Sequence, residues 1–197
     1  MNKGYALILA AGYSTRMGCC KALLPWGEGQ TLLSFQIRQW QQLQVEPIVV
    51  VGSHNVAEIQ PLLHCQLLVN PAASTGKVSS LLMGLQALPS SWNFLVISAV
   101  DQPRPSWVYA HLLKAHANRA ESITVPVYAD QTGHPVIFGA QFQSDLHSIT
   151  EVQFGIRQVL NNHPSRIQRV KINSPWVHAD LNTLADYNAA KIQRASL

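Results

Sequence analysis

The sequence has little charge and few cysteines. Charged residues occupy 12% of its 197 positions, whereas apolar residues occupy 47%. This balance excludes an intrinsically disordered chain and predicts a substantial buried core. The three cysteines, Cys19, Cys20 and Cys65, are too few for a disulfide framework. We expect them to be small core-filling residues in a reducing compartment.

Long apolar runs are also missing. No apolar stretch approaches the roughly 20 residues that a membrane-spanning helix needs. The first apolar segment, residues 5–11, is too short for the core of a signal peptide, and no cleavage site follows it. We therefore expect a cytoplasmic protein without a membrane partner.

Signatures of zinc and of nucleic-acid binding are weak as well. The eight histidines show no spacing typical of zinc ligands. The formal net charge is +4, but no cluster of lysines and arginines is interleaved with aromatic residues, so a nucleic-acid partner is not expected. A few cations gathered in one pocket explain the charge equally well and favour a small anionic substrate.

Short apolar bursts alternate with amphipathic segments along the first hundred residues. The bursts are at residues 5–10, 47–52, 65–70 and 93–98. They are continuously apolar, which is typical of strands in a parallel sheet that is covered on both faces. The expected helices between them are at residues 31–43, 55–63 and 76–88. This order predicts an α/β fold with a doubly wound, mostly parallel sheet flanked by helices.

After residue 100 the pattern is less regular. We expect helices at residues 105–118, 153–163 and 183–195, a strand pair at 122–128 and 134–139, and a strand at 166–172. No internal repeat or linker interrupts the chain. The sequence therefore predicts a single domain over residues 1–197.

The loop after the first strand carries the strongest chemical signal. Open α/β sheets bind ligands outside the carboxyl ends of their strands. Ala10, Ala11 and Gly12 leave room for a flat ring or a phosphate against the backbone, and Arg16 and Lys21 supply cations for phosphate oxygens. The loop is neither a P-loop nor a G-x-G-x-x-G fingerprint. The alternative is an ordinary glycine-containing loop with two solvated cations.

Two distant aspartates are candidates for a metal site. Asp101 ends an apolar strand and faces the ligand crevice, unless it caps the next helix. Asn182 or Thr183, with Asp186, suffices to cap the last expected helix, which leaves Asp180 free to share a metal ion with Asp101. Magnesium commonly takes one or two carboxylates together with substrate phosphates and water.

Two further segments have weaker signals. Ser79 and Ser80 lie at the start of an expected helix after Gly76, where free amides attract anions; alternatively, they are ordinary polar residues of a first turn. Residues 133–135 line a pocket for a second substrate or simply begin an edge strand.

Together these residues resemble the MobA-like nucleotidyltransferases, and among them the molybdenum cofactor cytidylyltransferases. The opening signature L-A-A-G-x-S-x-R-M-G-x-x-K runs from Leu9 to Lys21, and L-L-P-W follows to Trp26. Further motifs of the family appear in order, namely NP at 70–71, GKVSS at 76–80, DQP at 101–103, GHPVIF at 133–138 and DLNTLADY at 180–187. The resemblance covers nearly the whole chain.

The resemblance implies a nucleotide-diphospho-sugar transferase-like, Rossmann-like fold. It also implies a magnesium-dependent transfer of a nucleoside monophosphate from a nucleoside triphosphate, with release of pyrophosphate. In this interpretation Leu9, Ala10, Ala11 and Gly12 hold base and ribose, Arg16 and Lys21 hold the triphosphate, Ser79 and Ser80 lie near base and sugar, and Asp101 and Asp180 bind Mg²⁺.

The resemblance also suggests the two substrates. The first loop reads LAAG, whereas the guanylyl branch tends to read LAGG, so CTP is favoured over GTP as the donor. A phosphorylated pterin such as molybdopterin is the implied acceptor, and a molybdoenzyme is an implied partner. Two departures, at residues 75–78 and at Asn182, leave other interpretations open. These are a different donor or acceptor, and a nucleotide- or cofactor-binding partner of a molybdoenzyme without catalysis.

Overall fold

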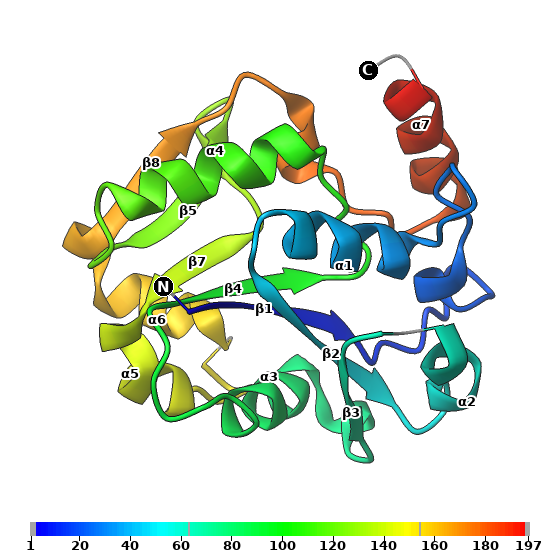
Figure 1. The fold of residues 1–197 in the computed structure, drawn as a ribbon, viewed down its shortest axis with the longest axis horizontal. Coiled ribbons are helices and arrows are strands. Elements are labelled where there is room, and N and C mark those ends of the chain that lie inside the picture. The colour runs from blue at the N-terminus through cyan, green and yellow to red at the C-terminus, as the bar shows by residue number, and fades with distance from the viewer. Residues whose placement is uncertain (1–2, 63, 154, 196–197) are drawn as a thin grey trace.

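The amino-terminal half of the chain builds the parallel part of a central sheet. A computed structural model describes residues 3–62, 64–153 and 155–195 (Figure 1). Strands β1 (Gly4–Ala10), β2 (Glu46–Gly52), β3 (Gln66–Asn70) and β4 (Phe94–Ala99) lie in the order β3-β2-β1-β4, and all pair in parallel. The four expected strands are confirmed, but the expectation that all are buried is wrong for β3, which lies at the edge of the sheet and has Val69 41% exposed. Their carboxyl ends meet at one edge of the sheet.

The second half of the sheet is mixed. Strand β7 (Val136–Gly139) runs antiparallel between β4 and β5 (Ile123–Tyr128), and β8 (Ile167–Lys171) pairs with β5 in parallel. The expected strand pair at 122–128 and 134–139 is confirmed as β5 and β7. A short extra strand, β6 (Gln131–Thr132), pairs with the end of β5.

Helices cover both faces of the sheet (Figure 1). Helices α1 (Leu32–Gln42), α4 (Ser106–Ala117) and α7 (Leu184–Ala195) pack on one face, together with the short α2 (Val56–Ile59). Helices α3 (Lys77–Gln86), α5 (Gln143–His147) and α6 (Ile156–Asn162) pack on the other. Alternate residues of β1 enter the two cores, so Ile8 belongs to the first and Leu7 to the second.

Two expected helices are shorter than the sequence pattern suggested. The segment 55–63 forms only α2 and a 3₁₀ turn, Gln60–Leu62, because Pro61 has no amide hydrogen to continue the α-helix. The segment 153–163 forms α6 only after Gly155, whose φ of 61° stops the helix from extending toward the amino terminus. Residues 63 and 154 of these segments lie outside the described residues.

The three cysteines differ in their surroundings. All three cysteines are free thiols. Burial raises the pKa of Cys65 to about 11, in keeping with an unreactive packing residue. Cys19 is exposed, so the expectation that it fills the core is wrong.

Within the described ranges, every helix is too short or too polar to cross a membrane.

Candidate functional site

Lys21 lies at the centre of a polar cluster at the carboxyl edge of the sheet. Its ammonium donates hydrogen bonds to Asp101 Oδ2 at 2.9 Å and to Asn182 Oδ1 at 3.2 Å. The Arg16 guanidinium donates to the same Asn182 oxygen at 3.2 Å. The Leu181 amide donates to the Asp101 carbonyl at 2.8 Å, which ties the last loop to the end of β4. The structure thus brings together Arg16, Lys21 and Asp101 from separate segments and adds Asn182.

The first loop reaches this cluster through a tight turn. Ser14 and Gly18 have positive φ angles, and the amides of Met17 and Gly18 both donate to the Ser14 carbonyl. The chain then enters a 3₁₀ turn, Lys21–Leu23, which fixes the backbone of Lys21. The Lys21 side chain is only 10% exposed and the Asp101 side chain 22%. The ion pair is therefore shielded from water but open to a ligand from one side.

Asn55 holds the start of the first loop in place, and the sequence analysis missed it. Its side chain is buried, accepts a hydrogen bond from the Gly52 amide at 2.9 Å and donates to the Ala10 carbonyl at 2.9 Å. It therefore joins the ends of β1 and β2. Its position, three residues past the end of an apolar strand, was the available signal.

A cavity of about 200 Å³ opens beside the ion pair. Gly12 lies on its wall, and a Cβ added there would meet no atom within 4 Å. The small residue is therefore not required by protein packing, and it leaves the backbone open to a ligand. The predicted residues that line the cavity are Leu9, Ala10, Ala11, Gly12, Lys21, Ser80 and Asp101.

The two serines of α3 have different surroundings. The Asn70 side-chain amide lies 2.9 Å from both serine hydroxyls. Ser80 is buried and lines the cavity. The Ser79 hydroxyl faces the carbonyls of Ala72 and Gly76 and does not belong to the cavity wall. Of the pair, only Ser80 is placed to contact a ligand in this cavity.

The amino end of α3 differs from the expectation of free amides. The two carboxylate oxygens of Glu151 accept hydrogen bonds from the Lys77 and Val78 amides, each at 3.0 Å. A carboxylate at this position is favoured by the partial positive charge of a helix amino terminus. The expected anion position is therefore occupied by an acidic side chain of the protein itself.

Arg104 is a buried cation that the sequence analysis did not single out. It is 1% exposed and comes directly after the D-Q-P motif. Burial lowers the pKa of its guanidinium, while Tyr109 and Asp180 act in the opposite direction. Its five N–H groups are all engaged. The acceptors are the carbonyls of Pro103, His134, Val177 and Ala179, and Asp180 Oδ1 at 3.5 Å.

This arrangement explains where Asp180 lies. Its carboxylate faces Arg104 and is 43% exposed, in the same loop as Asn182. Because the Leu181 amide binds the Asp101 carbonyl, Asp101 and Asp180 lie on the same side of the molecule. The described residues contain no group of three or more His, Cys, Asp or Glu side chains that could hold a metal ion.

The start of α7 is capped as expected. The Asp186 carboxylate accepts from the Thr183 amide at 2.8 Å, and Thr183 Oγ1 accepts from the Asp186 amide at 3.2 Å. The hydrogen bonds from Thr183 lower the pKa of Asp186. Because this reciprocal pair makes the cap, the Asn182 side chain is free to accept from Arg16 and Lys21.

A larger cavity of about 1010 Å³ adjoins the first. The two share Leu9, Lys77 and Ala99 in their walls. Gly133 and His134 of the expected second-substrate segment line the larger one. Burial, followed by the charge of Arg104, lowers the pKa of His134, so its imidazole is neutral at neutral pH. The charged side chains in this wall are Lys77, Arg157, Arg169 and Glu151.

Comparisons with known proteins concern the family and the fold of the chain. Residues 6–167 match the model of the MobA-like NTP transferase domain. No curated protein matches the sequence.

Three solved structures share the fold over nearly their whole length. One is a nucleotidyl transferase from Methanothermobacter, with 23% identity, coverage of 100% of this chain and 99% of that one, and a TM-score of 0.79. Another is a manganese complex of Rv0371c from Mycobacterium tuberculosis, with 20% identity, coverage of 95% and 97%, and a TM-score of 0.76. The third is a CMP:2-keto-3-deoxy-manno-octonic acid synthetase complexed with CTP, with 13% identity, coverage of 99% of both chains, and a TM-score of 0.73.

Proposed function

Because the chain belongs to the MobA-like NTP transferase family, we propose that it transfers CMP from CTP to a phosphorylated acceptor. The observation that supports this most directly is the shielded ion pair of Lys21 and Asp101 beside a glycine-walled cavity. An ammonium at that position suits the oxygens of a triphosphate. The LAAG sequence of the first loop favours CTP over GTP, and a related fold has been solved with CTP.

In this proposal the donor lies along the first loop. The backbone from Leu9 to Gly12 holds the base and ribose, and Ser80 lies near the sugar. Arg16 and Lys21, which share Asn182 as an acceptor, exchange it for the phosphates of the donor. No side chain acts as a nucleophile, so catalysis rests on positioning and charge neutralisation.

The reaction is an in-line displacement at the α-phosphorus of the donor. An oxygen of the acceptor phosphate forms a bond to this phosphorus, while the bond to the oxygen that bridges to the β-phosphate breaks. The electron pair of the broken bond leaves with pyrophosphate. Lys21 and Arg16 neutralise the charge that develops on the departing group.

A divalent cation fits the oxygen ligands of the cluster. Asp101 and Asp180 are the proposed ligands, and the Asn182 amide oxygen is a third hard oxygen nearby. Mg²⁺ would supply Lewis-acid stabilisation of the phosphate oxygens. The manganese complex of the Mycobacterium tuberculosis protein supports a divalent ion in this fold.

The larger cavity is the proposed acceptor site. Lys77, Arg157 and Arg169 outnumber the single acid Glu151 in its wall, which suits a phosphorylated molecule. Its volume of about 1010 Å³ accommodates a tricyclic pterin such as molybdopterin, and a molybdoenzyme would then receive the product. A cytoplasmic location is part of the same proposal.

A pyrophosphate-release assay tests the proposal. The chain is incubated with Mg²⁺ and each of the four nucleoside triphosphates, with and without molybdopterin. We expect release only with CTP and acceptor together. Lys21→Ala and Asp101→Ala should each lower the rate by about a hundredfold or more, whereas Lys171→Ala, on the exposed side of β8, should leave it unchanged.

Two outcomes would contradict the proposal. Near-normal turnover of the Lys21 or Asp101 variant would show that the assigned roles are wrong. Stabilisation of the protein by a nucleotide, with no pyrophosphate in any mixture of donor and acceptor, would favour a nucleotide-binding protein that does not catalyse transfer.

A further inference from the structure

A glutamine side chain of α1 is buried in the apolar core behind the end of β4. Gln36 is 0% exposed, and its neighbours in the chain, Phe35 and Ile37, belong to that core. Its Nε2 donates a hydrogen bond to the Val100 carbonyl at 2.8 Å, whereas its Oε1 has no partner among the described residues. Burying an amide that is only half paired is unfavourable for stability. What the side chain contributes is therefore its bond to Val100.

The acceptor of this bond lies in the middle of a tight turn that carries Asp101. Strand β4 ends at Ala99, and the Gln102 amide donates to the Ala99 carbonyl at 3.0 Å. Val100 and Asp101 are therefore the two central residues of a β-turn. In the described part of the chain, Gln36 is the only donor to the Val100 carbonyl.

The orientation of the central peptide decides where the Asp101 side chain points. Rotation of this peptide by about 180° converts a type I turn into a type II turn, which needs a positive φ at its second central residue. The φ of Asp101 is not positive, so the turn does not have type II geometry. The bond from Gln36 opposes this rotation, because the rotation would turn the Val100 carbonyl away from Nε2. The Asp101 carboxylate thus stays where it meets the Lys21 ammonium at 2.9 Å.

We propose that Gln36 is a positioning residue for Asp101. It lies in the core and acts through the Val100 carbonyl, which fixes the turn between β4 and the D-Q-P segment. The expected effect on catalysis rests on the proposed function, in which Asp101 is a ligand of the divalent cation. The expected effect on the turn does not.

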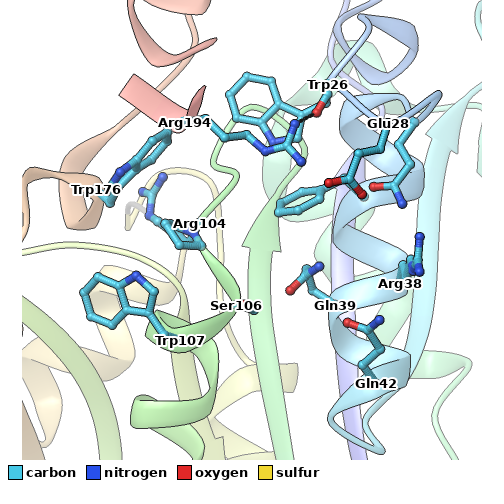
Figure 2. Close-up of a pocket in the computed structure, with 13 residues that line it drawn as sticks. Trp26, Glu28, Arg38, Gln39, Gln42, Arg104, Ser106, Trp107, Trp176 and Arg194 are labelled. Atoms are coloured by element: carbon cyan, nitrogen blue, oxygen red, sulfur yellow. Dashed lines mark hydrogen bonds between the residues drawn. The ribbon is translucent and has the colours of Figure 1, made fainter. Parts of the chain in front are cut away.

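Gln39, one turn further along α1, provides a matched control. Its Oε1 is also buried without a partner among the described residues, and its side chain makes no hydrogen bond to Val100. It lines a cavity of about 410 Å³ together with Arg38 and Trp107 (Figure 2). Replacing either glutamine by leucine removes a buried amide from α1, but only Gln36→Leu removes the bond to the turn.

Hydrogen exchange of the full-length protein without ligands, followed by NMR, tests the role in the turn. The two informative amides are those of Gln102 and Leu181, which donate to the carbonyls of Ala99 and Asp101. We expect Gln36→Leu to raise their exchange rates by about tenfold or more relative to the amide of Leu7 in the middle of β1. Gln39→Leu should leave both ratios unchanged.

Steady-state kinetics with CTP, Mg²⁺ and acceptor test the consequence. Gln36→Leu should lower kcat by about tenfold or more and leave the KM for CTP within about twofold, because a displaced carboxylate loses alignment in the transition state. Gln39→Leu should keep the parent kcat. In Gln36→Glu, the protonated carboxyl can donate to Val100 and the ionised one cannot. The ratio of its kcat to that of the parent should therefore fall as the pH rises.

Three results would overturn the proposal. They are unchanged exchange at Gln102 and Leu181 in Gln36→Leu, equal acceleration there in Gln39→Leu, and a normal kcat of Gln36→Leu beside an active parent. If the parent releases no pyrophosphate in any mixture, the proposed function fails, while the exchange rates still decide the role of Gln36.

Discussion

At the scale of single residues, Gly12 and Gly84 differ in the surroundings that an added side chain would meet. The Cα of Gly12 faces open space at the wall of the cavity proposed for the donor, whereas Gly84 of α3 faces the side chain of Leu7 in the core. The same added methyl group therefore has opposite consequences at the two positions. At Gly12 it would fill space in the cavity proposed for the donor, and at Gly84 it would overpack the protein.

We predict that Gly12→Ala raises the KM for CTP by about tenfold and leaves the melting temperature within about 1 °C of the parent. Gly84→Ala should lower the melting temperature by several degrees and leave the KM unchanged. Thermal unfolding and steady-state kinetics of both variants check this. A Gly12→Ala variant with normal KM would mean that no ligand approaches this part of the loop.

The second prediction at this scale concerns Arg104. A lysine has three donors and cannot replace the five that the guanidinium directs to separate acceptors. Arg104→Lys should therefore lower the free energy of unfolding by about 3 kcal/mol in urea titrations. Arg119→Lys, at an exposed position, is the control and should change it by less than about 0.5 kcal/mol. Equal stability of both variants would contradict the role of Arg104 in joining these loops.

At the scale of elements, the amino end of α3 depends on a side chain from a distant loop. Glu151 supplies the hydrogen bonds that a local cap would normally supply, because Gly76 has no side chain to do so. The geometry of this helix end is therefore set by a tertiary contact over more than 70 residues of sequence.

We predict that Glu151→Ala lowers the free energy of unfolding by about 1 kcal/mol. The amide protons of Lys77 and Val78 should exchange with solvent faster, while those in the middle of α4 should not change. Hydrogen exchange followed by NMR measures both. Glu121→Ala is the matched control, since the Glu121 side chain is 85% exposed. Unchanged exchange at Lys77 and Val78 would refute the capping role.

The elements also show what could be predicted from the sequence. Continuous apolar bursts identified β1 to β4. Strands β1, β2 and β4 are largely buried on both faces and have few polar positions, whereas β3 lies at the edge of the sheet and is only partly buried. The prediction that Lys21 and Asp101 lie close together is confirmed, because parallel strands place their carboxyl ends at one edge of the sheet. Asn55, Arg104 and Asn182 were not identified as site residues. Their contacts are long-range hydrogen bonds, and no local periodicity records those.

At the scale of the whole molecule, the sheet continues from the parallel strands into the mixed ones through the pairing of β4 with β7. We propose that residues 1–197 form a single domain that unfolds in one transition. The two faces of the sheet carry different cavities. A cavity lined by residues of α1 and α4 lies on one face, and the cavity proposed for the acceptor is lined by residues of α3 and α6.

Stability should depend on pH through His116. Burial lowers the pKa of His116 from 6.5 to about 4, and its Nδ1 lies 2.9 Å from Thr124 Oγ1. Between these two values the unfolded chain binds the proton and the folded chain does not. The stability that depends on neutral His116 is therefore fully present above pH 6.5. As the pH falls from 6.5 toward about 4, the free energy of unfolding decreases by on the order of 3 kcal/mol through this group.

Urea unfolding at a series of pH values measures this dependence. The variant His116→Leu cannot bind the proton in either state, so the decline between pH 6.5 and 4 should be smaller by a similar amount. A variant with the same slope as the parent would show that other groups cause the decline.

The hydrogen bonds from Arg16 and Lys21 to Asn182 span more than 160 residues of sequence. During translation, the donor loop leaves the ribosome long before the segment that completes its charged cluster. A nascent chain therefore lacks part of this cluster until residue 182 has emerged. If this cluster holds the donor as proposed, ribosome-bound chains stalled before that point should fail to retain CTP.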